Sequence, residues 1–347
     1  GELSFPLQSE PHVAAWRHYA DDATRIGPFS ALQERLVQLR FPVCAGISQC
    51  PEYRAATRRG VTAEGMLEAT GLQLSNPVEL QLVIHDSFAG PVPVLIAGGR
   101  EDFVALIQAL TARNEPVPIP ASMGAMMVAG FNNWDRIRQR KEQWQAEHSD
   151  DKSGDGWEQE FSEKVVPDKT LYQDKFIILS DGPYSGVAAD DLGLSGAEWR
   201  EISLTIRLEH ECTHYFTRRC FGSAKNHLLD EVIADYTGIV AATGQFRADW
   251  FLRFMGLEKY PTYRPGGRLE IYRGEPPLSD GAFEILQKLI KRAADNLEQF
   301  DREHATQLSE PEQRRRILLA LCRMRLPDLA SDQCASLLSQ ALVGSSA

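Results

Sequence analysis

Two histidines four residues apart, with a glutamate between them, constrain this chain most: the sequence reads His210-Glu211-Cys212-Thr213-His214. On an α-helix, residues at this spacing lie about 40° apart on one face, so both imidazoles can reach one ion. Catalytic zinc takes three protein ligands and keeps one open position. A glutamate beside the first histidine can act as a base on a zinc-bound water. The motif therefore predicts a metal-binding helix.

The flanking sequence supports a helix from Ser195 to Phe221. Ser195 and Glu198 have the spacing of a capping box, and no proline interrupts the stretch. An apolar stripe leads directly into the two histidines and consists of Trp199, Ile202 and Ile206. Three arginines occupy other sides: Arg200, Arg207 and Arg218. Because the histidines continue a buried stripe, where an imidazole without a partner would be costly, a metal role is favoured for both.

A second helix is predicted over residues 228–240, after a short polar connection that contains Gly222 and Asn226. Glu231 and Asp235 lie at positions i and i+4 of this helix and therefore share one face. The carboxylate of Glu231 is the candidate third ligand.

These residues resemble the gluzincin metallopeptidases, the thermolysin-like class. In that class a glutamate on the helix after His-Glu-x-x-His completes the zinc site, and a carboxylate four residues later orients one histidine. The resemblance covers about 30–40 residues. It implies three zinc ligands, namely His210, His214 and Glu231. It also implies that Glu211 is the general base and that Asp235 accepts the other N–H of a ligand histidine, which fixes the tautomer and orientation of that ring.

Other ligand sets fit less well. Cys220 falls six residues after His214, where metzincins have their third histidine, but Thr217 replaces the glycine at which that family turns the chain. His227 and Asp230 are close in sequence but lie outside the Glu-x-x-x-Asp arrangement. A di-iron helical bundle would need a second Glu-x-x-His motif, and the chain has none.

The expected activity is that of a zinc metallopeptidase, a hydrolase that cleaves peptides or proteins with Zn²⁺ as its cofactor. Glu211 would take a proton from the zinc-bound water and later pass it to the leaving amine. Two alternatives stay open: a zinc hydrolase of a non-peptide amide or ester, and a non-catalytic interaction protein that holds a structural zinc. The oxyanion-stabilising group is expected in the segment 260–273, with Tyr263 slightly favoured over the other donors there, including Tyr272.

Composition excludes several partners. The net charge of −11 argues against nucleic acid and anionic membranes, since both attract basic surfaces. No apolar run approaches the roughly 18 residues that span a bilayer, and no signal peptide is visible. The six cysteines form no dense framework. Cys212 is expected to be a packed thiol, and Cys44 and Cys50 are either core residues, a disulfide or a metal pair. A cytoplasmic protein is the default expectation.

The predicted fold class is α+β, and the chain is expected to have three parts. Residues 1–150 would form an N-terminal α/β domain. Residues 151–245 would form a zincin-like catalytic core with a small mixed or antiparallel sheet, and residues 246–347 a mainly helical region. The polar stretch 148–156 is interpreted as a linker or mobile loop.

Strand patterns occur at three places. Residues 78–84 alternate between apolar and other side chains, residues 92–97 are continuously apolar, and the turn between them predicts a hairpin. Lys175–Ser180 precedes the metal helix. Gluzincins commonly have an edge strand here that binds the substrate backbone, and this strand would do the same if it is an edge. The alternative is a central core strand, and periodicity does not separate the two. Helices are expected over residues 100–112 and 136–147.

Overall fold

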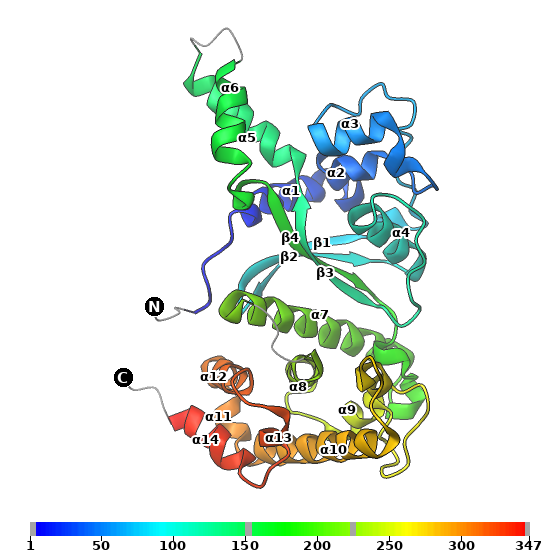
Figure 1. Cartoon of the computed structure of the whole chain (residues 1–347), viewed down its shortest axis with the longest axis vertical. Coiled ribbons are helices and arrows are strands. Elements are labelled where there is room, and N and C mark those ends of the chain that lie inside the picture. The colour runs from blue at the N-terminus through cyan, green and yellow to red at the C-terminus, as the bar shows by residue number, and fades with distance from the viewer. Residues whose placement is uncertain (1–4, 150–154, 223–226, 344–347) are drawn as a thin grey trace. The chain divides into compact units, whose positions relative to one another are not determined.

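The computed structural model describes residues 5–149, 155–222 and 227–343. The chain divides into two compact units, Gly1–Asp181 and Gly182–Ala347. Helices predominate, and the described residues contain one four-stranded mixed sheet, so the predicted α+β class is confirmed (Figure 1). No described helix combines the length and the apolar composition that crossing a bilayer requires.

The first unit is built around the sheet, whose strand order is β1-β2-β4-β3. Its strands are β1 (Gln81–Ser87), β2 (Gly90–Ala97), β3 (Ala125–Asn132) and β4 (Gln173–Ser180). Antiparallel pairing joins β1 to β2 and β3 to β4, and β2 runs parallel to β4. The predicted hairpin is confirmed, although its first strand begins three residues later than the pattern indicated, because Pro77–Glu79 forms a 3₁₀ turn.

β4 is an inner strand, so of the two alternatives for Lys175–Ser180 the central core strand is confirmed. Its side chains explain why: Phe176, Ile177, Ile178 and Leu179 are all fully buried. A continuous apolar run of this kind is typical of a strand that is covered on both faces. Because β4 lies between β2 and β3 and has no free edge, it cannot bind a substrate backbone as an added strand.

The described residues of the first unit form six α-helices. They are α1 (His12–Ile26), α2 (Pro28–Arg35), α3 (Pro51–Arg59), α4 (Arg100–Thr111), α5 (Trp134–Glu147) and α6 (Asp155–Glu160). Of these, α1 and α4 pack against the strands of the sheet. Side chains of α1 and α4, among them Trp16 and Phe103, form one apolar cluster with Leu95 of β2 and Phe176 of β4. The predicted helices over 100–112 and 136–147 correspond to α4 and α5. Of the expected linker, residues 150–154 lie outside the described residues.

The second unit is helical. Its elements are α7 (Gly196–Phe221), α8 (His227–Thr243), α9 (Ala248–Met255), α10 (Asp280–Glu303), α11 (Ala305–Leu308), α12 (Pro311–Leu321), α13 (Leu326–Leu329) and α14 (Cys334–Val343). α7 starts as the sequence predicts: the Ser195 side chain accepts from the backbone of Glu198, whose own side chain accepts from Ser195, and Gly222 ends the helix in a left-handed conformation.

The two units divide the chain differently from the three expected parts. β4, expected with the metal helices, belongs to the sheet of the first unit. The region after residue 245 is continuous with the metal helices in the second unit, because α8 packs against α9 and α12 as well as α7.

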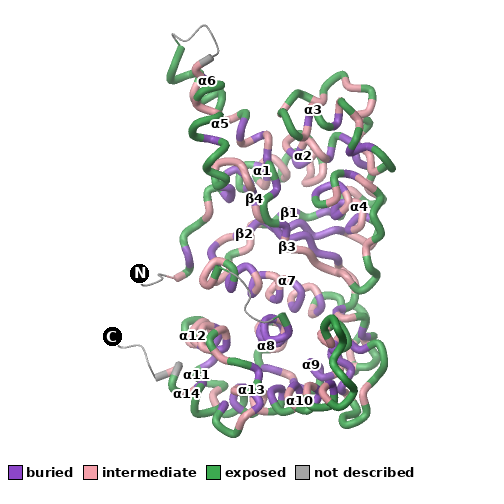
Figure 2. Tube along the Cα trace, viewed as in Figure 1, coloured by how far each residue is buried: buried purple, intermediate pink, exposed green. Residues whose placement is uncertain are grey.

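α8 is buried on nearly every side (Figure 2). Such a helix is held by packing in all directions rather than along one stripe. A buried polar network adds to this: the Tyr236 hydroxyl donates to Asp301 of α10 at 2.7 Å, and Arg314 of α12 pairs with the same carboxylate. The position of α8 is thus fixed relative to α10 and α12 by directional bonds as well as by apolar contact.

α7 and α8 approach closely at Gly238. A methyl group on this glycine would lie 2.5 Å from the carbonyl oxygen of Ile206. Gly238→Ala is therefore expected to force the two helices apart and to lower the free energy of unfolding by about 1–3 kcal/mol, measured by urea denaturation.

Gly281→Ala in α10 is the matched control, since no atom lies within 4 Å of the added methyl group. That change is expected to raise the free energy of unfolding by about 0.4–1 kcal/mol, because alanine lowers the conformational entropy of the unfolded chain. Equal stability of the two variants would contradict the close approach of α7 and α8.

Candidate metal centre

Three side chains from α7 and α8 converge in the second unit. His210 and His214 lie one turn apart on α7, and Glu231 lies in the first turns of α8. The two Nε2 atoms are 3.0 Å apart. His210 Nε2 lies 3.4 Å from Glu231 Oε2, and His214 Nε2 lies 3.4 Å from Glu231 Oε1. The sequence prediction that these three residues share one site agrees with this placement.

The distances fit a tetrahedral ion. Nitrogen and oxygen ligands bound to zinc at about 2.0–2.1 Å lie about 3.3 Å from one another. The observed separations of 3.0 to 3.4 Å have this size. Among the His, Cys, Asp and Glu side chains that the structure describes, these three form a group without a fourth member. The residues present therefore fit a three-ligand site with one position left for water or substrate.

Asp235 lies one turn after Glu231, on the same face of α8, and is fully buried. Its Oδ1 is 2.9 Å from His210 Nδ1. A histidine whose Nδ1–H donates to a carboxylate keeps the lone pair on Nε2, where a metal would bind. The contact that the resemblance implies between Asp235 and a ligand histidine is present, and the histidine is His210.

Two residues that the sequence analysis did not assign complete this network. The Tyr184 hydroxyl donates to Asp235 Oδ1 at 2.6 Å and lies 2.9 Å from His210 Nδ1. Arg268 pairs with the other oxygen of Asp235 and donates to the Tyr184 hydroxyl at 3.3 Å. Arg207, buried on α7, lies 5.7 Å from the centre of the Tyr184 ring and donates to the carbonyls of Gly182 and Pro183, just before Tyr184.

This arrangement leaves the partly buried negative charge of Glu231 facing the two histidines. The guanidinium of Arg268 balances the carboxylate of Asp235. Burial alone would raise the pKa of Glu231, but hydrogen bonds with His210 and His214 hold that pKa well below its ordinary value. Glu231 is therefore ionised in a partly buried site, where a charge needs a partner, and a cation between the three side chains would supply one.

Tyr272 contacts the same carboxylate from the 3₁₀ segment Arg268–Arg273. Burial first, and then the charge of Glu231, raise the pKa of Tyr272, so its hydroxyl keeps its proton and donates to Glu231. Tyr263, which the sequence slightly favoured as the oxyanion-stabilising donor, is bonded within its own loop. Its hydroxyl donates to the Gly267 carbonyl at 2.7 Å. Of the two tyrosines, Tyr272 is the one that contacts a site residue.

Glu211 follows His210 on α7 and is half-buried. Its carboxylate makes no hydrogen bond or ion pair with any residue that the structure describes. A general base needs such a carboxylate, because an ion-paired one would have to break that contact before it could take a proton.

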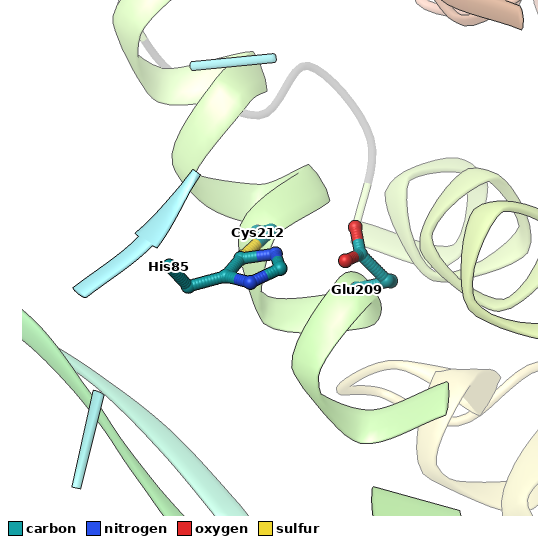
Figure 3. A group of neighbouring side chains, drawn as sticks. All are labelled: His85, Glu209 and Cys212. Carbon is teal, nitrogen blue, oxygen red and sulfur yellow. The ribbon is translucent and has the colours of Figure 1, made fainter. Parts of the chain in front are cut away.

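The competing ligands stay outside this group. Cys220 is half-buried, His227 is exposed and Asp230 is buried, and none of the three joins the cluster of described donor atoms. Cys212 is buried and burial raises the pKa of its thiol, which confirms the packed thiol. Figure 3 labels Cys212 together with Glu209, which lies on the same helix, and His85, which belongs to β1 of the first unit. Cys44 and Cys50 are free thiols, not a disulfide.

Asp235→Ala is expected to weaken zinc affinity about 10–100-fold, because the His210 ring would lose the acceptor that fixes its orientation. Competition against a chromophoric chelator measures this. Asp235→Asn keeps an acceptor for Tyr184 and His210 but loses the charge that faces Arg268, so its affinity should fall between those of the alanine variant and the wild type. Wild-type affinity in Asp235→Ala would contradict the role given to this carboxylate.

Comparison with known proteins identifies a family without assigning it an activity. No curated protein and no solved structure matches the chain. A family of unknown function (DUF7005) matches residues 1–333. Because this match covers nearly the whole sequence, the chain that carries the α7–α8 centre belongs to the DUF7005 family.

Proposed function

We propose that this protein is a zinc-dependent metallopeptidase of gluzincin type, in which α7 and α8 form a zincin-like catalytic centre. The observation that carries the proposal is the convergence of two Nε2 atoms and one carboxylate at separations of 3.0 to 3.4 Å. Peptides or proteins would be its substrates.

The roles of the chain's own groups follow from their chemistry. His210, His214 and Glu231 would hold the ion, which when bound supplies a Lewis acid and lowers the pKa of water. Glu211 would accept a proton from the attacking water and deliver it to the leaving amine. Asp235, Tyr184 and Arg268 would keep the His210 ring in the tautomer that leaves Nε2 free.

Two features favour a catalytic over a structural zinc. A structural site is closed by four protein ligands, whereas the group of described donors here has three members. The Glu211 carboxylate, next to a ligand and without a partner among the described residues, would have no purpose in a closed site.

The test combines metal analysis with cleavage. Purified protein is expected to contain one zinc per chain and to cleave members of a diverse peptide pool, detected by mass spectrometry, with activity lost in a chelator and restored by zinc. Parallel assays with small amides and esters distinguish the proposal from its nearest alternative. Turnover of those compounds without any peptide cleavage would make the protein a non-peptide hydrolase, and full activity in the chelator would contradict the metal mechanism.

A further inference from the structure

A pocket lies in the first unit, in residues that the metal centre does not use. It has a volume of about 770 Å³ and lies between the end of α3, the start of α5 and the segment that contains α6. Pockets for small molecules and cofactors commonly have volumes of about 300–1,000 Å³. Its lining combines two kinds of side chain, cationic and aromatic, and each points to part of a ligand.

The cationic side chains that line the pocket come from two helices. Arg58 and Arg59 form the last turn of α3, and Arg138 and Lys141 belong to α5. Arg138 is paired with Asp135, but Arg58, Arg59 and Lys141 are exposed and make no ion pair with any described residue. Among the residues that the structure describes, Glu158 is the one carboxylate that lines the pocket with them.

This excess of positive charge occurs in a chain whose net charge is −11. A local cationic cluster on an acidic protein attracts an anion to that cluster and not to the surface as a whole. Arginine in particular matches the geometry of phosphate and carboxylate oxygens.

The aromatic side chains form the pocket's wall, and one of them is held firmly. The Trp134 indole N–H donates to the Thr57 carbonyl at 2.7 Å. Gly60 lies directly against the same ring, since a methyl group on it would be 2.4 Å from a ring carbon. Trp157 and Phe161 line the pocket from the other segment, with ring centroids 5.9 Å apart. Aromatic side chains bind planar rings by stacking. For nucleobases this stacking depends little on which base is bound.

We propose that this pocket binds a small ligand that joins an anionic group to a planar ring, and that its class is the nucleoside phosphates. The phosphate would contact Arg58, Arg59 and Lys141, and the base would pack against the aromatic wall. A nucleic-acid polymer fits less well, because binding along a polyanion needs an extended basic surface and the chain is acidic overall.

The experiment is isothermal titration calorimetry of the full chain with AMP, ATP, GMP and UMP, and with adenosine, inorganic phosphate, indole-3-acetate and a short oligonucleotide. At least one nucleotide is expected to bind, and more tightly than adenosine or phosphate alone. Its affinity should be unchanged in EDTA, because the pocket shares no residue with the metal centre.

The variant Arg58→Glu/Arg59→Glu is expected to weaken nucleotide binding by at least about 10–100-fold, the usual effect of losing charge-assisted contacts. Arg17→Glu/Arg54→Glu is the matched control. It makes the same change in charge at exposed arginines of the same unit that do not line the pocket, and it should bind like the wild type. Circular dichroism checks that both variants are folded.

Four results would overturn the proposal: no nucleotide binding, equal weakening in both double variants, binding that EDTA abolishes, or a marked preference for indole-3-acetate or the oligonucleotide over every mononucleotide. These results are separate from the metallopeptidase test, which measures zinc and cleavage in the second unit.

Discussion

Glu211→Gln is expected to lower kcat for peptide cleavage by about 10²–10⁴-fold, the usual contribution of a positioned general base. Glutamine keeps the size of the side chain but cannot accept a proton at neutral pH. The zinc content should stay at one ion per chain, because Glu211 is not in the group of donor atoms formed by His210, His214 and Glu231. Steady-state kinetics on a cleaved peptide and elemental analysis of the same sample measure both quantities.

Glu201→Gln provides the control for this result. Glu201 is exposed on α7, so the change removes the same charge from the same helix without touching the centre. Its kcat should equal that of the wild type. Full turnover by Glu211→Gln would refute the base, whereas loss of zinc from this variant would show that Glu211 acts on the metal site itself.

Glu231→Ala is expected to reduce zinc affinity by more than about 100-fold, beyond the range seen when only a hydrogen-bond partner of a ligand is removed. Two imidazoles from one helix turn would remain, and they would leave the ion without its anionic ligand. The loss should appear as less than stoichiometric zinc after dialysis and as a much weaker constant in chelator competition.

His227→Ala tests whether Glu231, and not a nearby histidine of α8, is the third zinc ligand. His227 begins α8, only four residues before Glu231, and is a histidine that could in principle bind zinc. It is exposed and lies outside the group of donor atoms, so its removal should leave zinc affinity unchanged. Loss of zinc in His227→Ala together with retention of zinc in Glu231→Ala would show that His227, and not Glu231, is the third ligand.

The local features of the centre could be predicted from sequence because they depend on short-range spacing. The capping box at Ser195 and the absence of proline predict α7, and the i, i+4 spacing places each pair of functional residues on one face. The prediction that α8 would bring Glu231 to the histidines also needed the helices to pack closely. Gly238 permits that approach, but its role is visible only once the carbonyl of Ile206 is seen beside it.

Tyr184 and Arg268 could not be predicted in the same way. They lie 51 and 33 residues from Asp235 in sequence, and no periodic pattern links loop residues at such distances. Tyr184 follows a Gly-Pro turn and Arg268 a Gly-Gly turn, so each looks like an ordinary surface position. Arg207 was equally hidden, since an arginine within a helix is usually solvated, whereas here it is buried against two backbone carbonyls.

The position of β4 within the sheet also could not be predicted from the local sequence. An apolar run such as Phe176–Leu179 fits an edge strand of a covered sheet as well as an inner one, and only its partners decide. Those partners, β2 and β3, are separated from β4 by long stretches of chain. The choice between an edge and a central strand therefore depended on topology rather than on propensity.

The central claim is that His210, His214 and Glu231 bind one zinc ion. Zinc-edge X-ray absorption spectroscopy of the purified, zinc-loaded protein tests it most directly. We expect a first shell of two imidazole nitrogens with carboxylate and water oxygens at about 2.0–2.2 Å, and loss of the imidazole signal in a His210→Ala/His214→Ala variant. A sulfur shell at about 2.3 Å, or a wild-type spectrum that this double variant reproduces, would contradict it.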